Sequence, residues 1–143
     1  MAELDPDNTT EIIRKRYDRN AGGYDLSELL LEAMGFHRWR RLLWSKVEGS
    51  RILEVGVGTG KNFPYYPPGA EITAVDFSDK MLHRAREKAG RQMVNVRLQQ
   101  MDVQQLDFAD DSFDTVVASF VFCSVPDPVR GLKEVARVCR PGG

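Results

Sequence analysis

Apolar and polar positions follow two different periods along this chain, and their alternation predicts an α/β protein. Short apolar runs with the length of buried strands occupy residues 52–55, 71–75, 94–101 and 113–120. Between and after these runs, apolar residues recur at helical spacing. Strands that alternate with helices predict a parallel sheet, because the crossovers that join such strands are right-handed and place helices on its faces.

Helix boundaries can be predicted from capping residues. Asn8 with Glu11 resembles a capping box, and further helices are expected over 27–34 and 37–47. Ser78 should cap the helix after the second strand, and Gly90 should end it. The last helix should begin at Asp127-Pro128. Its inward-facing residues are predicted to be Leu132, Val135, Ala136 and Cys139.

Three glycines interrupt the pattern directly after the first strand, at Gly56, Gly58 and Gly60. Glycine tolerates positive φ and has no Cβ, so the backbone can turn sharply and approach a ligand closely. The second strand ends in Asp76. A strand, a glycine turn, a helix and a strand that ends in a carboxylate are typical of a nucleoside-binding half-sheet. A dinucleotide motif would need a third glycine where this chain has Lys61.

At these residues the sequence resembles the class I S-adenosylmethionine-dependent methyltransferases, whose first motif has the form E/D-x-G-x-G-x-G. Four further blocks in the same order carry the resemblance over roughly residues 50 to 143: residues 76–82, 100–103, 106–119 and 132–143. The resemblance implies a Rossmann-like three-layer sandwich, with strand order 3-2-1-4 in the part present. It also implies S-adenosyl-L-methionine as the cofactor and S-adenosyl-L-homocysteine as its product.

The resemblance also implies roles for individual residues. Asp76 would bind the ribose hydroxyls, and Asp102 would meet the edge of the adenine. For Glu54 two roles stay open, a direct ligand or a hydrogen-bonded brace for the glycine loop. No cluster has metal-ligand spacing, so no metal is predicted. The full predicted cofactor set is Glu54, Gly56, Gly58, Gly60, Asp76, Phe77, Met81, Asp102, Val103 and Ser119.

The acceptor side is less determined by the sequence, and no catalytic residue is identified. Residues 1–48 are predicted to form a helical lid or cap over the cofactor-binding half, residues 49–143. Tyr17 and Tyr24 are lid candidates, or else ordinary aromatics of amphipathic helices. Phe120 and Cys123 follow the fourth strand and are candidates for the acceptor pocket, although a free cysteine there also suits a buried position.

Composition and charge indicate which kinds of partner this chain can bind. The net charge of −1 and pI near 6.1 give no general attraction to nucleic acid. Two cysteines make no disulfide framework, and the N-terminus has no apolar signal region, so a cytoplasmic protein is expected. Residues 36–46 are basic and rich in tryptophan. Such a helix can touch the inner membrane face peripherally, or it can pack on the sheet with a solvated basic face.

Two segments suggest the acceptor. Residues 35–46 resemble quinone-biosynthesis C-methyltransferases, and residues 121–128 resemble bacterial phospholipid N-methyltransferases and membrane-associated thiol methyltransferases. All three act on lipid-like or membrane-proximal acceptors. Methyl transfer to a small or lipid-like acceptor is therefore predicted. The alternative is a chain that binds the cofactor without turnover.

The sequence ends where the family's fifth strand should begin. It is then either truncated or a minimal half-fold. In the half-fold, the fourth strand would be an exposed edge that pairs with a second copy, because an unpaired apolar edge is a template for association. A homo-oligomer is expected in that case.

Overall fold

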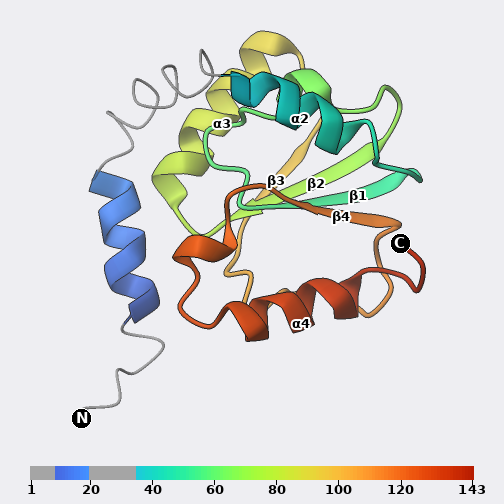
Figure 1. Ribbon diagram of the computed structural model, residues 1–143. Coiled ribbons are helices and arrows are strands. Elements are labelled where there is room, and N and C mark those ends of the chain that lie inside the picture. The colour runs from blue at the N-terminus through green and yellow to red at the C-terminus, as the bar shows by residue number, and fades with distance from the viewer. Residues whose placement is uncertain (1–8, 20–34) are drawn as a thin grey trace.

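A computed structural model describes residues 9–19 and 35–143. Its sheet is formed by four strands: β1 (Arg51–Val55), β2 (Glu71–Asp76), β3 (Arg97–Gln100) and β4 (Thr115–Ala118). All neighbours are parallel, and the order is β3-β2-β1-β4 (Figure 1). The predicted parallel sheet and its strand order are confirmed.

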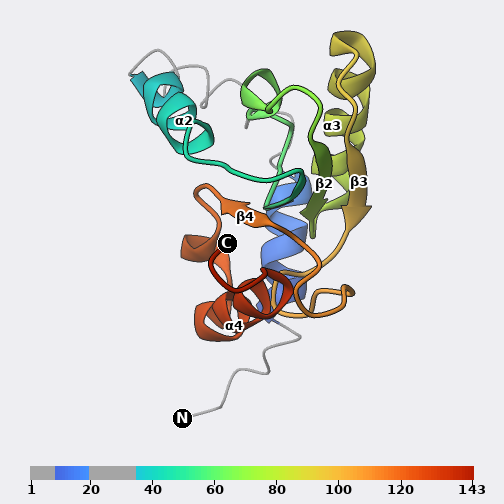
Figure 2. The same cartoon turned by 90° about the vertical axis from the view of Figure 1, so that its right-hand side faces the viewer.

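Helices cover both faces of the sheet, which gives the three predicted layers (Figure 2). α2 (His37–Trp44) and α3 (Asp79–Gln92) lie on one face, and α4 (Pro128–Val138) lies on the other. Two short 3-10 helices, η2 (Phe63–Tyr65) and η3 (Phe122–Ser124), follow β1 and β4. The predicted helix over 27–34 lies outside the described residues.

Successive side chains of β1, an inner strand, alternate between the two faces of the sheet. Leu53 and Val55 pack in the cluster on the α4 side, whereas Ile52 packs with Trp44 of α2 on the opposite side. All three strand residues are fully buried. Burial on both faces explains why this strand reads as a continuous apolar run instead of an alternating one.

Two helix predictions are wrong in detail. α3 passes through Gly90 and ends at Gln92. Met93 caps it, adopting φ 52° and donating its N–H to the carbonyls of Ala89 and Gly90. In α4, Leu132 and Ala136 are exposed and Gly131 is buried instead. A Cβ at Gly131 would lie 3.0 Å from the Phe122 ring, so the missing side chain lets this face of the helix approach the loop after β4.

Asp114 joins the beginnings of two strands. Its Oδ2 accepts the backbone N–H groups of Ser50 at 3.0 Å and Arg51 at 2.8 Å, and its Oδ1 accepts from the Arg51 guanidinium at 3.1 Å. The Arg51 N–H and guanidinium hold the pKa of this carboxyl well below its ordinary value. These bonds fix β4 beside β1 at the end of the sheet opposite the glycine turn.

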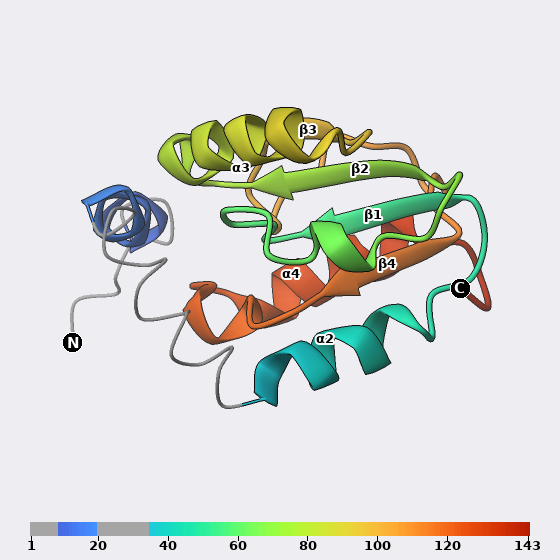
Figure 3. The same ribbon diagram turned by 90° about the horizontal axis from the view of Figure 1, so that it is seen from above.

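The helix over residues 9–19 lies beyond the carboxyl ends of the strands (Figure 3). Ligands of open α/β sheets bind at this end. Within the described ranges, no helix has both the length and the apolar character needed to cross a bilayer.

Candidate functional site

The three glycines after β1 all have positive φ, but the reasons for glycine differ. A Cβ at Gly56 would clash with Val121, and a Cβ at Gly60 would clash with the ring of Phe63. A Cβ at Gly58 would meet nothing within 4 Å. Gly56 and Gly60 therefore allow close packing, whereas Gly58 leaves open space above the turn.

Asp76, at the end of β2, faces this open space. Its Oδ2 accepts the N–H of Gly58 at 2.8 Å, and its Oδ1 accepts the N–H of Ser78 at 2.9 Å. The side chain is 6% exposed. Burial raises the pKa of Asp76, and the backbone N–H groups of Ser78 and Gly58 oppose that rise. The carboxylate is thus held in one orientation at the edge of a cavity.

The cavity contains about 900 Å³ of empty space, including solvent at its mouth, and it lies at the carboxyl ends of the strands. Its wall brings together most of the residues predicted from the sequence, although they come from separate parts of the chain. These are Tyr17, Gly56, Gly58, Asp76, Phe77, Met81, Asp102, Val103, Ser119 and Phe120.

Asp102 is fixed by a neighbour that the sequence did not suggest. Its Oδ1 accepts from the Gln104 N–H at 2.9 Å, and its Oδ2 accepts from Gln104 Nε2, also at 2.9 Å. Gln104 also donates to Thr10 Oγ1 at 3.2 Å and accepts the N–H of Asp127 at 3.0 Å. One buried amide therefore connects the cavity wall to the N-terminal helix and to the start of α4.

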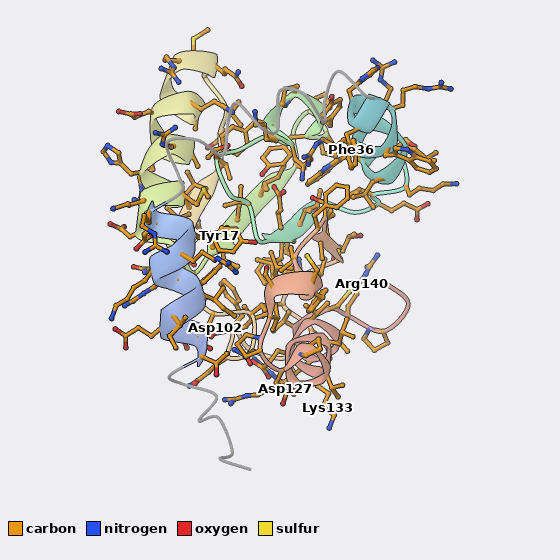
Figure 4. The ribbon with its side chains drawn as sticks, turned by 60° about the vertical axis from the view of Figure 1, so that its left-hand side comes forward. Tyr17, Phe36, Asp102, Asp127, Lys133 and Arg140 are labelled. Carbon is orange, nitrogen blue, oxygen red and sulfur yellow. The ribbon has the colours of Figure 1, made fainter. Side chains whose placement is uncertain are left out.

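The N-terminal helix forms one side of the cavity. Thr10, Ile13 and Tyr17 line it. The Tyr17 ring packs edge-on against Phe77 with a centroid distance of 5.5 Å, and Asp18 accepts a hydrogen bond from the Ser78 hydroxyl. In Figure 4, Tyr17 comes from this helix, whereas Phe36 comes from the start of α2. Tyr24 lies outside the described residues.

Among the described residues of the predicted set, three lie off the cavity wall. Gly60 packs against Phe63, as described above. Cys123 is exposed, with its Sγ 3.6 Å from the Phe120 carbonyl oxygen. Glu54 is fully buried beneath the glycine turn, a position that fits the brace better than the direct ligand.

Glu54 accepts two hydrogen bonds in this buried position, from Asn62 Nδ2 at 2.5 Å and from the Tyr66 hydroxyl. Burial raises the pKa of Glu54 to about 7, and the bonds from Tyr66 and Asn62 oppose the rise. Tyr66 is affected in turn, since burial and the adjacent carboxylate raise its pKa.

Sequence reasoning missed Arg40 and Asn62, which both line the cavity. Arg40 is only 7% exposed, and its Nη1 donates to Asn62 Oδ1 at 2.9 Å. Asn62 Nδ2 also donates to Ser119 Oγ at 3.0 Å. Arg40 and Trp44 lie four residues apart on the buried face of α2, so the spacing was available as a signal. A basic residue within an apolar stripe is normally predicted to face solvent, so the burial of Arg40 was not predicted.

Phe120 lines the cavity in a strained backbone conformation. Its φ is 59°, a region that L-residues rarely occupy, and its side chain is 60% exposed. The Phe36 ring lies 5.2 Å from it, and the Arg40 guanidinium carbon lies 5.6 Å from its centroid. Strain of this kind is often found at functional sites.

Comparisons with known proteins agree with this geometry. The model of the methyltransferase domain family matches residues 53–143. A phosphatidylethanolamine N-methyltransferase of Cereibacter sphaeroides is 53% identical over 98 residues, which cover 66% of this chain and 48% of that protein. A ubiquinone/menaquinone biosynthesis C-methyltransferase of Bdellovibrio bacteriovorus is 38% identical over 139 residues, or 93% of this chain and 59% of the relative.

A solved structure shares the fold. A SAM-dependent methyltransferase of Thermotoga maritima, described as a possible histamine N-methyltransferase, superposes with a TM-score of 0.66 at 27% identity. The match covers 87% of this chain and 55% of that one. The chain thus spans between about half and three fifths of the length of the two curated relatives above. With the sheet, the glycine turn and the Asp76 carboxylate inside the matched region, the chain belongs to the methyltransferase domain family, which implies S-adenosylmethionine as its cofactor.

Proposed function

We propose that this protein transfers the methyl group of S-adenosylmethionine to a small or lipid-like acceptor. The observation that carries the proposal is the placement of Asp76. Two backbone N–H groups, one of them from the glycine turn, hold its carboxylate against a cavity at the carboxyl ends of the strands. This is the position from which an acid binds the hydroxyls of a nucleoside.

The residues of the cavity fit the cofactor. Gly58 leaves open space where a side chain would stand, so a ligand can approach the backbone. Phe77 and Met81 offer apolar surface for a base, with Asp102 beside them. Two carboxylates on the wall favour a ligand that carries positive charge. Asp76 would hold the ribose, and Asp102 would hold the edge of the adenine.

The chain's part in the reaction would be alignment. When bound, the cofactor supplies a methyl group on a sulfonium with a good leaving group, so positioning accounts for much of the rate. Ser119 and Phe120, at the end of β4, would border the acceptor. The N-terminal helix, through Tyr17, would close one side against water and act as a lid.

A lipid-like acceptor is supported by the relatives' names and by the exposed face of α2. One relative named above is a phosphatidylethanolamine N-methyltransferase, and the other is a C-methyltransferase of ubiquinone and menaquinone biosynthesis. On α2, Trp39 is 67% exposed and Leu42 is 50% exposed, beside the exposed Arg38 and Arg41. Such a face suits peripheral contact with an anionic membrane surface, as on the cytoplasmic side. A phospholipid amine, a quinol carbon and a thiol are the candidate acceptors.

A second candidate function is cofactor binding without turnover. It is favoured by the cavity wall, which brings together most of the residues predicted to bind the cofactor. In the described sheet, β4 pairs with β1 on one side only, so its other edge is available to a second copy. A monomeric mass in light scattering at micromolar concentration would contradict pairing through this edge.

Calorimetry tests cofactor binding. S-adenosylhomocysteine should bind the unmodified chain, and Asp76→Ala should weaken binding at least tenfold, because a charge-assisted hydrogen bond is lost. The exposed Asp107→Asn is the matched control and should bind normally. Unchanged affinity in Asp76→Ala would show that the ribose is not held there.

Methyl transfer is then assayed with three acceptors: vesicles that contain phosphatidylethanolamine, a quinol and an alkyl thiol. Transfer to one of them supports the first function and names the acceptor class. Binding of the cofactor with no transfer to any supports the second. No binding at all would contradict both.

A further inference from the structure

The side-chain amide of Gln104 uses its hydrogen-bonding groups on three separate segments. It is 6% exposed, and its Nε2 donates to both carboxylate oxygens of Asp102, at 3.1 Å to Oδ1 and at 2.9 Å to Oδ2. The same nitrogen donates to Thr10 Oγ1 of the N-terminal helix, and Oε1 accepts the N–H of Asp127, the residue that caps α4. Asp102 and Asp127, labelled in Figure 4, are thus joined through one side chain.

These bonds fix the orientation of the amide. If it were flipped, its oxygen would face the Asp102 carboxylate and its nitrogen would face the N–H of Asp127, and both contacts would be repulsive. A buried amide held at both ends in this way also holds its partner in place. Asp102 lines the cavity. A carboxylate has about four lone pairs, so Asp102 can still accept a hydrogen bond from a ligand.

Two contacts of the N-terminal helix fall on the segments that carry the carboxylates of the cavity. Near one end of the helix, Tyr17 packs edge-on against Phe77, which directly follows Asp76. Near the other end, Thr10 accepts from Gln104, which holds the second carboxylate. A ligand that fixes these carboxylates should therefore favour the docked helix, and the docked helix should favour the ligand by the same factor.

We infer that Gln104 is a positioning residue, which orients Asp102 toward the base of the cofactor and links that contact to docking of the N-terminal helix. The inference rests on the proposed function, in which Asp102 holds the edge of the adenine. That edge carries an exocyclic amino group, which donates a hydrogen bond that a carboxylate accepts. Hydrogen bonds weaken steeply away from their preferred angle, so recognition of the amino group depends on how firmly Asp102 is held.

The first test compares two ligands that differ only in the base, S-adenosylhomocysteine and S-inosylhomocysteine, by calorimetry. The inosine form has an oxo group in place of the amino group, so an acceptor would face the carboxylate. The unmodified chain should bind S-adenosylhomocysteine at least about tenfold more tightly. Gln104→Met keeps the length of the side chain without its hydrogen bonds, and it should reduce this ratio to about threefold or less. The exposed Gln105→Met is the matched control and should keep the ratio.

Two further variants extend this comparison. Gln104→Glu keeps an oxygen for the N–H of Asp127 but places a second carboxylate beside Asp102, so it should also reduce the ratio, and it serves if Gln104→Met does not fold. Thr10→Val removes the acceptor on the helix and leaves the amide beside Asp102. It should therefore keep the base selectivity.

The second test follows hydrogen exchange of the backbone amides of residues 9–19. At saturation, S-adenosylhomocysteine should slow this exchange in the unmodified chain and in Gln105→Met. The protection should be smaller in Gln104→Met and in Thr10→Val, because each variant lacks the bond between the amide and the helix.

Equal weakening of both ligands in Gln104→Met, with the ratio preserved, would overturn the inference, because Gln104 would then only support the fold. Unchanged affinity for both ligands, or helix protection equal to that of the unmodified chain, would also overturn it. If the unmodified chain binds both ligands equally, the inference fails while the proposed function stands. If it binds neither, both fail.

Discussion

Glu54 should make the fold less stable as the pH rises. It is fully buried, and burial raises its pKa from an ordinary 4.5 to about 7. An acid with a raised pKa holds its proton more tightly in the folded chain than in the unfolded one. The free energy of unfolding should therefore be highest below pH 4.5 and should fall as the pH rises through about 7.

The size of this fall follows from the two pKa values. Each pH unit between them costs about 1.4 kcal/mol, so the interval from 4.5 to about 7 corresponds to a loss of about 3–4 kcal/mol. Glu54→Gln keeps the shape of the side chain but cannot ionise. The free energy of unfolding of the Glu54→Gln variant should therefore not show this fall with pH. Above pH 7 it should exceed the free energy of unfolding of the unmodified chain.

Urea unfolding, followed by circular dichroism at pH 5, 6, 7 and 8, measures both curves. The exposed Glu48→Gln is the matched control and should follow the unmodified chain. Parallel curves for Glu54→Gln and the unmodified chain would refute the reasoning. So would a stability that rises with pH only when Glu54 is present.

Two further predictions concern the glycine turn and Asp114. Gly60→Ala should cost about 2–3 kcal/mol of unfolding free energy, because its Cβ would enter the Phe63 ring at a positive φ. Gly58→Ala should cost about 1–2 kcal/mol from its φ alone, yet weaken S-adenosylhomocysteine more than Gly60→Ala does, since its methyl enters the cavity. Equal affinities in the two variants would contradict this. Asp114→Asn should lower the melting temperature at pH 7, and because the native pKa is depressed, the difference from the unmodified chain should shrink below about pH 4. A constant difference down to pH 2 would contradict that prediction.

Much of the sheet and the cofactor side could be predicted because their signals are local. The run before Gly56 has the length and composition of a buried strand, and a carboxylate at the end of the next parallel strand must lie beside the turn. The position of Asp76 follows from this register alone. Strand ends were less predictable. Phe113 lies outside β4, where it forms an isolated bridge with Cys139, and the sequence gives no local sign of that contact.

Contacts between distant segments could not be predicted. Whether Arg40 faces solvent or the cavity depends on the rotation of α2, which Trp44 fixes by its burial against Ile52. Gln104 lies in no recognisable sequence motif. Its link between the cavity wall, the N-terminal helix and α4 depends on contacts with Thr10 and Asp127. In both cases a polar side chain is placed by tertiary packing, whereas pattern reasoning assigns polar residues to the surface.

The acid of the glycine motif therefore reaches the cavity only through a neighbour. Glu54 and Arg40 both form hydrogen bonds with the side-chain amide of Asn62. The Glu54 carboxylate accepts from its nitrogen, and the Arg40 guanidinium donates to its oxygen. Asn62 therefore lies between the two charged groups: Glu54 is buried beneath the glycine turn, and Arg40 lies on the cavity wall. Removal of the charge of Glu54 should then act first on stability.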